Sequence, residues 1–218
     1  MVIYPEVVAG NPLGAKHVVR YLLNRPGVFT GVGSEAYGAD DYLLHFAEEF
    51  RPEGVESRLL RLPLVDTTVF RPPSPPSARH GFMVYRHRHR PDVADFPAWA
   101  TPVTVVSRDA PRDPPTLAGL YGSSRALIVG ERTLAIAEAM HCHCPVIVLP
   151  HAGFEYKPLV AFYGGHGLCV GFDRAALARA SESVAAFPSH YAGRFSDVDQ
   201  QVLAFVSDAA RFFGLPHF

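Results

Sequence analysis

Apolar runs and helical stretches alternate regularly in the second half of the chain. Short apolar runs rich in β-branched residues predict strands at 81–85, 103–107, 126–129, 146–149 and 168–170. Stretches with helical spacing separate them, at 115–123, 133–142 and 155–163. Strands that alternate with helices are joined by crossovers, which produce a parallel sheet covered on both faces. This pattern predicts an α/β fold.

Further helices are predicted after the last strand, at 173–187 and 196–213. In the second of them, apolar residues recur on one helical face, which we expect to pack against the body of the protein. The residues of this face are Val198, Val202, Leu203, Val206, Ala209 and Phe213.

The beginning of the chain has a less regular α/β pattern. Residues 2–8 and 59–65 are short apolar runs that predict strands. Apolar positions in 14–24 follow helical spacing, and Pro26 ends that pattern. The pattern of 42–50 fits a helix or a strand, and we favour the helix.

A proline-rich segment at residues 71–76 indicates the main boundary of the chain. It divides the sequence into a partial N-terminal α/β region, 1–72, and a larger region, 78–218. No internal repeat is visible.

Composition excludes several classes of protein. The formal net charge is −1, so no overall field attracts nucleic acid, and no nucleic-acid partner is expected. No apolar run approaches the ~20 residues that cross a bilayer. The first residues lack the basic and apolar regions of a signal peptide. We therefore expect a cytoplasmic protein, or one peripheral to the inner face of the membrane.

The cysteines predict neither disulfides nor a metal site. Their number is odd, and Cys142 and Cys144 are separated by one residue, so reduced thiols are expected. His141 and His143 alternate with them, but ligands at i and i+2 of a helix point apart. No second Cys/His pair with zinc-site spacing occurs. No metal or other cofactor is expected.

Residues 130–150 carry the most informative chemistry, because a strand, a turn, a helix and a second strand follow one another there. Ligands of open parallel sheets lie outside the carboxyl ends of the strands. Free N–H groups at the start of the helix suit a diphosphate, and Thr133 is placed to cap that helix. Glu138 lies on the same helix, and a carboxylate accepts hydrogen bonds from two sugar hydroxyls.

This segment resembles the GT-B glycosyltransferases, in particular retaining enzymes that use nucleotide-diphosphate sugars. The matching residues are Glu138-Ala139-Met140 and Cys144-Pro145-Val146-Ile147, with His143 where a glycine is usual. Residues 4–6, 10–13 and 18–27 are similar to the end of the N-terminal domain of bacterial members, and 66–72 is similar to the interdomain connection.

The resemblance implies a Rossmann-like nucleotide-sugar-binding domain preceded by a shortened N-terminal domain. It also implies that the chain moves a hexosyl group from a nucleotide sugar to a saccharide or lipid-linked acceptor, as in polysaccharide biosynthesis. Glu138 would bind the nucleotide ribose, Thr133 and Arg132 the diphosphate, and Glu131 would act at the donor sugar as a catalytic residue.

Three basic residues are further candidates for donor binding. Arg86 and Arg88 follow a strand at the position of a family phosphate site, and arginine forks suit diphosphates. If the segment stays extended, its arginines share one face. Lys16 would face the cleft from the N-terminal region. The alternative for the two arginines is a solvated basic loop or a nucleic-acid patch, and for Lys16 it is a surface lysine. His17, His45 and His151 are candidate bases because histidine titrates near neutral pH.

Other functions remain open. A truncated relative without activity would serve as a binding module or partner subunit, and a GT-B-fold epimerase is a second alternative. A plain Rossmann-type oxidoreductase is disfavoured, because no Gly-x-Gly-x-x-Gly follows a strand. An incomplete N-terminal layer would leave a sheet edge exposed, so a homo-oligomer or a missing partner chain is expected.

Overall fold

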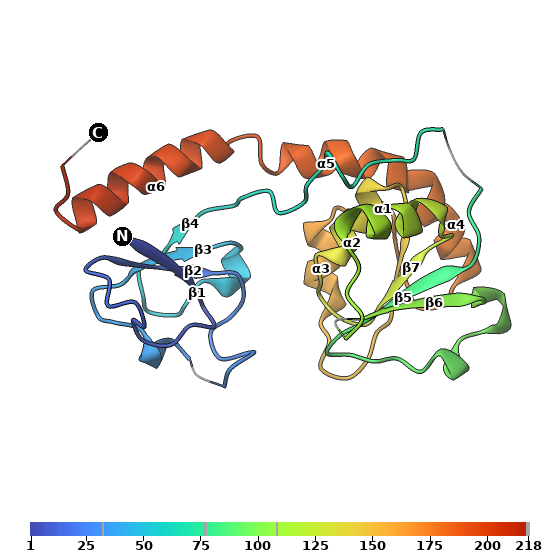
Figure 1. Cartoon of the computed structure of the whole chain (residues 1–218), viewed down its shortest axis with the longest axis horizontal. Coiled ribbons are helices and arrows are strands. Elements are labelled where there is room, and N and C mark those ends of the chain that lie inside the picture. The colour runs from blue at the N-terminus through green and yellow to red at the C-terminus, as the bar shows by residue number, and fades with distance from the viewer. Residues whose placement is uncertain (32, 76–77, 108, 217–218) are drawn as a thin grey trace. The chain divides into compact units, whose positions relative to one another are not determined.

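The computed structural model describes the whole chain except residues 32, 76–77, 108 and 217–218. It is an α/β protein that divides into two compact units. Residues 1–63 and 194–218 form the first unit, and residues 64–193 form the second (Figure 1). No helix among the described residues is long and apolar enough to cross a membrane.

The first unit contains a parallel sheet with strand order β1-β2-β3-β4 in its described residues. The strands are β1 (Val2–Pro5), β2 (Val18–Leu22), β3 (Tyr42–His45) and β4 (Arg58–Leu59). Short 3-10 turns occur at η1 (Ser34–Ala36) and η2 (Glu48–Phe50).

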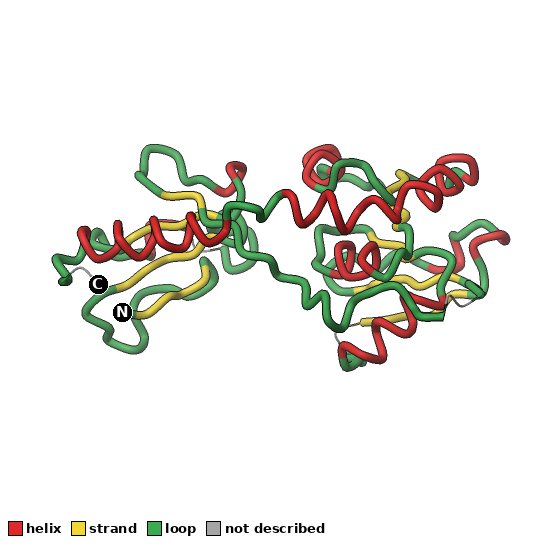
Figure 2. Tube along the Cα trace, turned by 90° about the horizontal axis from the view of Figure 1, so that it is seen from above, coloured by secondary structure: helices red, strands yellow, loops and turns green. Residues whose placement is uncertain are grey.

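Helix α6 (Val198–Phe212) packs on this sheet, and Figure 2 shows it running along the strands. Phe205 and Ala209 are buried there against Val19, Tyr42 and Leu44. Val202 and Phe213 pack at the edge of the same cluster, as expected from the helical pattern. Leu203 and Val206 are exposed, so the expected face was partly wrong. The contact face runs through Val202, Phe205, Ala209 and Phe213.

Two secondary-structure predictions for this unit were wrong, and a third, the strand at 59–65, holds only at Leu59, where β4 ends. Residues 14–24 contain strand β2 instead of a helix, and 42–50 begins with strand β3 and ends with η2. The adjacent apolar pairs in 18–23 fit a strand buried on both faces as well as a helix, and pairing with β1 and β3 decides between them.

Arg20 is fully buried in the centre of this sheet. Its Nε lies 2.6 Å from Oδ2 of Asp41, and its Nη1 donates to the carbonyl of Val8 at 2.7 Å. Its Nη2 donates to the carbonyl of Gly10. The guanidinium also lies over the rings of Tyr4 and Tyr37. It therefore ties the loops that follow β1 and precede β3 to the sheet.

The second unit contains a parallel sheet with strand order β6-β5-β7-β8-β9 in its described residues. The strands are β5 (Phe82–Arg86), β6 (Val103–Ser107), β7 (Leu127–Val129), β8 (Val146–Val148) and β9 (Leu168–Val170). All lie where the apolar runs predict them.

The helices of this unit are α1 (Pro114–Ser123), α2 (Ala135–His141), α3 (Tyr156–Phe162), α4 (Arg174–Ser183) and α5 (Phe187–Gly193). Short 3-10 turns are η3 (Val93–Asp95), η4 (Ala98–Ala100) and η5 (Val184–Ala186). The helix predicted at 173–187 is divided at η5, and α5 follows as a separate element. Helices α1, α2 and α3 lie within a few residues of their predicted positions.

The two faces of the second sheet are covered by different connections. Phe82, Ile128 and Ile147 share one face, where η3, η4 and α4 cover them. The intervening residues, such as Met83 and Leu127, point to the opposite face, and α2 contacts β7 and β8. The connection after β5 and the connection after β7 therefore lie on opposite faces.

The unit boundaries differ from the predicted regions, 1–72 and 78–218, at two places. The proline-rich segment belongs to the second unit, because Phe70 packs near Tyr121 and Pro73 lies against Gly122. Pro76 is outside the described residues. Helix α6 belongs to the first unit, because its apolar face completes the core of that sheet.

Candidate functional site

The strand order of the second unit creates a topological switch point between β5 and β7. These strands are neighbours, yet the chain leaves them toward opposite faces of the sheet. At such a point the following loops diverge, and ligands of open α/β sheets bind in the space outside the carboxyl ends. The segments at this position are residues 86–90, which begin at the last residue of β5, and residues 130–134 after β7, here called the switch-point loops.

An ion pair joins the two switch-point loops. Nε of Arg88 lies 2.8 Å from Oε2 of Glu131, and the backbone N–H of Arg88 donates to Oε1 of the same carboxylate at 3.1 Å. Nη2 of Arg88 also donates to the carbonyl of Arg132 at 3.0 Å. Glu131 is buried, whereas the Arg88 side chain is about half exposed. Glu131 therefore positions Arg88 and the loop around it.

A third loop, after β8, is joined to the switch-point loops through histidine. Nε2 of His151 lies 2.7 Å from the carbonyl oxygen of Gly130. The ring of His89 stacks on His151, with centroids 3.9 Å apart, and burial together with His151 lowers the pKa of His89. The three loops at this edge of the sheet are thus a single connected structure.

The segment 86–90 does not stay extended, so its arginines have separate neighbours. Nη2 of Arg86 donates to the carbonyl of Pro91 at 2.6 Å, and its Nε is buried without a hydrogen-bond partner in the described residues. Arg90 pairs with Asp109 at 2.8 Å. The condition for a shared arginine face, an extended segment, is therefore not met, because strand β5 ends at Arg86.

Helix α2 begins with a weaker cap than expected. Its N-cap residue is Leu134, and Oγ1 of the preceding Thr133 accepts from the N–H of Ala135 at a long 3.4 Å. Thr133 and Arg132 are both partly exposed next to Glu131. The two residues therefore lie in the switch-point loop, at the carboxyl end of β7.

Glu138 lies one helical turn further along α2, half-buried against α1. The hydroxyl of the buried Tyr121 donates to its Oε2 at 3.4 Å, and burial raises the pKa of Glu138. Among the described residues, this long hydrogen bond from Tyr121 is the side-chain contact that holds the Glu138 carboxylate. The structure gives it a packing partner that the sequence did not reveal.

The other candidates from the sequence lie elsewhere. Lys16 is exposed in the first unit, beside a hollow lined also by Asn11 and Asp41. His17 packs on Phe213, and Nδ1 of the buried His45 lies 3.0 Å from Oγ of Ser57. Lys16, His17 and His45 all belong to the first unit.

The described cysteines are free and buried, as expected. Burial raises the pKa of Cys142 and Cys169 to about 11 and that of Cys144 to about 12. No group of three His, Cys, Asp or Glu side chains in the described part of the chain is arranged to hold a metal ion.

Sequence reasoning placed the loop that begins at Gly130 at this edge but missed the role of His89, which stacks on His151 and lies against Gly130. The available signal was the position of His89 after β5, because the carboxyl ends of neighbouring parallel strands lie at the same edge of a sheet. Comparisons with known protein families and with curated proteins found no match to this chain.

Proposed function

We propose that this chain transfers a glycosyl group from a nucleotide-diphosphate sugar to a hydroxyl of a saccharide or lipid-linked acceptor. The observation that carries the proposal is the basic switch point of the second unit. Arg86 is the last residue of β5, Arg88 follows that strand, and Arg132 follows β7. An anionic donor suits this combination of position and charge.

The diphosphate is assigned to the switch-point loops. Guanidinium groups bind phosphate oxygens with paired hydrogen bonds, and Arg88 is held in place by Glu131. Charge grows on the diphosphate as it departs from the sugar, and fixed donors stabilise that charge without reorganisation. Held arginines therefore favour the transition state of glycosyl transfer.

Glu138 is assigned to the ribose of the donor. Its carboxylate accepts only a 3.4 Å hydrogen bond from Tyr121, which leaves lone pairs for a vicinal diol. Burial raises its pKa, and two hydroxyl donors would favour the ionised form. The resemblance to the GT-B motif around Glu138 supports the same role.

One observation favours a second candidate, a nucleotide-binding module without catalytic activity. Both carboxylate oxygens of Glu131 are engaged by Arg88, so this residue acts as a positioning group in the present structure. A module that binds a nucleotide needs such a group and no catalytic carboxylate.

Thermal unfolding with UDP, GDP, ADP or TDP tests the proposal. A ligand present at 100 times its Kd stabilises the native state by about 2.7 kcal/mol, so one nucleotide should raise the midpoint. Glu138→Ala should reduce that rise, whereas Glu182→Ala, at an exposed position on α4, should leave it unchanged.

Turnover distinguishes the two candidates. Release of a nucleoside diphosphate from its sugar donor, with glycosylation of an added acceptor, supports glycosyl transfer. Nucleotide binding without turnover supports the binding module. If no nucleotide raises the midpoint, both candidates are wrong.

A further inference from the structure

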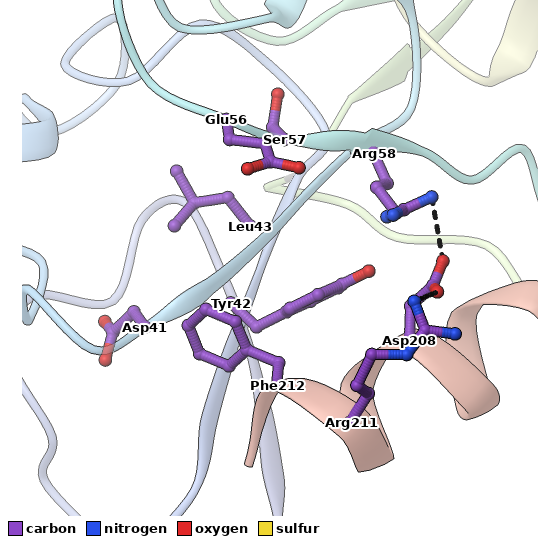
Figure 3. Close-up of a pocket in the computed structure, with 9 residues that line it drawn as sticks. All are labelled: Asp41, Tyr42, Leu43, Glu56, Ser57, Arg58, Asp208, Arg211 and Phe212. Carbon is purple, nitrogen blue, oxygen red and sulfur yellow. Dashed lines mark ion pairs between the residues drawn. The ribbon is translucent and has the colours of Figure 1, made fainter. Parts of the chain in front are cut away.

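The first unit contains a small cavity at the amino ends of β3 and β4, beside the last turns of α6 (Figure 3). Its volume is about 200 Å³. The residues that line it are Asp41, Tyr42, Leu43, Glu56, Ser57, Arg58, Asp208, Arg211 and Phe212. The lining residues come from three segments of the chain. The volume of the cavity lies below the ~300–1,000 Å³ that is typical of sites for drug-sized ligands. The cavity therefore fits a ligand of about one ring.

The hydroxyl of Tyr42 has no hydrogen-bond partner among the described residues. The residue is 8% exposed, and its ring meets that of Phe212 edge to face at 5.3 Å. Figure 3 shows the hydroxyl directed toward the ion pair of Arg58 and Asp208. A buried polar group without a hydrogen-bond partner destabilises the protein, so a ligand hydroxyl that bonds this phenol gains affinity.

Most of the charges around the cavity are already paired. Asp208 accepts from Arg58 at 2.8 Å and lies 3.5 Å from Arg211. Asp41 pairs with Arg20 at 2.6 Å. Glu56 takes part in no ion pair within the described residues and supplies the remaining carboxylate at the rim. With the Arg20 partner of Asp41 included, three carboxylates meet three guanidinium groups, so the surroundings carry no net formal charge and favour a neutral ligand.

We propose that this cavity binds a neutral polyhydroxylated ring, namely one monosaccharide unit. The apolar face of such a ring packs on Phe212, and the Glu56 carboxylate accepts from two adjacent hydroxyls. Guanidinium N–H groups that Asp208 does not use donate to other hydroxyls. A hydroxyl both donates and accepts, so it also satisfies the Tyr42 phenol.

Access to the Tyr42 hydroxyl requires a side-chain movement. The oxygen is shielded from solvent, but the residues around it are at the surface. Phe212 is 53% exposed, and the Arg58 side chain is 49% exposed. Rotamer changes of this size are common when ligands bind, so rotation of Phe212 opens the path.

The cavity is independent of the proposed donor site. It lies at the amino ends of its strands and is formed entirely by residues of the first unit. Saccharide binding here would stand if the switch-point loops bound no nucleotide, and nucleotide binding there would stand if this cavity bound no sugar.

Saturation-transfer difference NMR on the full chain tests the proposal with D-glucose, D-galactose and D-mannose as probes. Acetate and leucine serve as anionic and zwitterionic comparisons. Glu56→Gln and Tyr42→Phe should each weaken the binding of the preferred sugar by about three- to tenfold, as expected for one lost hydrogen bond. Glu53→Gln removes the same charge from the same loop outside the cavity and should have no effect.

Thermal unfolding of each variant without sugar shows whether weaker binding comes from a lost contact or from a damaged fold. Tyr42→Phe should not lower the unfolding midpoint without sugar, because its hydroxyl has no partner to lose. Saccharide binding that both cavity variants weaken and the control does not supports the proposal. The absence of saturation transfer to all three sugars, stronger competition by acetate or leucine, or equal binding by all variants would overturn it.

Discussion

The ring of His89 occupies the space in which a side chain on Gly130 would lie. A Cβ built on Gly130 meets Cδ2 of His89 at 2.0 Å. The same glycine offers its carbonyl to His151, on which His89 stacks. The absence of a side chain at one residue of a switch-point loop therefore permits the contact that joins all three loops.

Gly130→Ala should destabilise the second unit and displace His89. Inserting a methyl group into a closed contact typically costs ~1–3 kcal/mol, measurable by urea unfolding. Gly119→Ala is the matched control, because nothing lies within 4 Å of its Cβ position in α1. That change should stabilise the helix by about 0.5–1 kcal/mol. Equal stability of both variants would contradict the close approach.

His143→Gly should stabilise the protein. Helix α2 ends in a Schellman motif, in which the N–H of Cys144 donates to Ala139 and that of His143 to Met140. His143 has a φ of 56° there, and this left-handed conformation costs an L-residue ~1–2 kcal/mol. Relief of that strain should raise the free energy of unfolding by up to about 1 kcal/mol, since glycine also gains entropy when unfolded. A loss of stability would show that the histidine ring contributes more than the strain costs.

Arg20→Met should severely destabilise the first unit. The change removes the guanidinium that pairs with Asp41 and donates to two loop carbonyls, and breaking a buried ion pair costs about 3–5 kcal/mol. Chemical denaturation measures the loss. Arg211→Met, at an exposed pair, should cost less than about 1 kcal/mol. If Arg20→Met were as mild as this control, the buried network would not stabilise the fold.

Glu138→Gln should stabilise the protein at neutral pH in the absence of ligand. Burial raises the pKa of Glu138 above its ordinary 4.5, so the folded state keeps a proton that the unfolded state has lost. The free energy of unfolding therefore falls as pH rises from about 4.5 through the raised pKa. The amide carries no charge, so this pH dependence should diminish in the variant. Denaturant unfolding of the wild type and the variant at several values from about pH 4 to about pH 8 measures this pH dependence. Glu182→Gln, at an exposed position, is the control.

Acid should loosen the packing of α2 against α5 through His141. Its buried ring contacts Phe187 and Tyr191 at 5.2 and 5.0 Å, and burial, aided by His143, lowers its pKa. The unfolded state therefore binds more protons, and stability falls as pH drops below the ordinary value of 6.5 toward the lowered pKa.

His141→Phe should reduce this acid sensitivity, measured as the difference in unfolding free energy between mildly acidic and neutral pH. The exposed His80 provides a control, since His80→Gln should preserve the difference. An unchanged difference in His141→Phe would assign the acid sensitivity to another group.

The regular half of the sequence determined most of the second unit. Strands β5 to β9 follow from short apolar runs, because strands of a covered parallel sheet are buried on both faces and need continuous apolar sequence. Position after a strand also placed Arg88, Glu131 and Thr133 at one edge. The local sequence pattern was enough to predict this unit, because strand–helix–strand crossovers in a parallel sheet have few alternative arrangements.

Tertiary structure alone decided the first unit and the partners within each site. Nothing in the spacing of 18–22 distinguishes a buried strand from a helix, and pairing with β1 and β3 made it a strand. Helix α6 joins a sheet more than a hundred residues earlier in the chain, because its apolar face completes that core. The pairing of Arg88 with Glu131 and the unpartnered Tyr42 hydroxyl likewise depend on distances between segments, which a linear pattern does not encode.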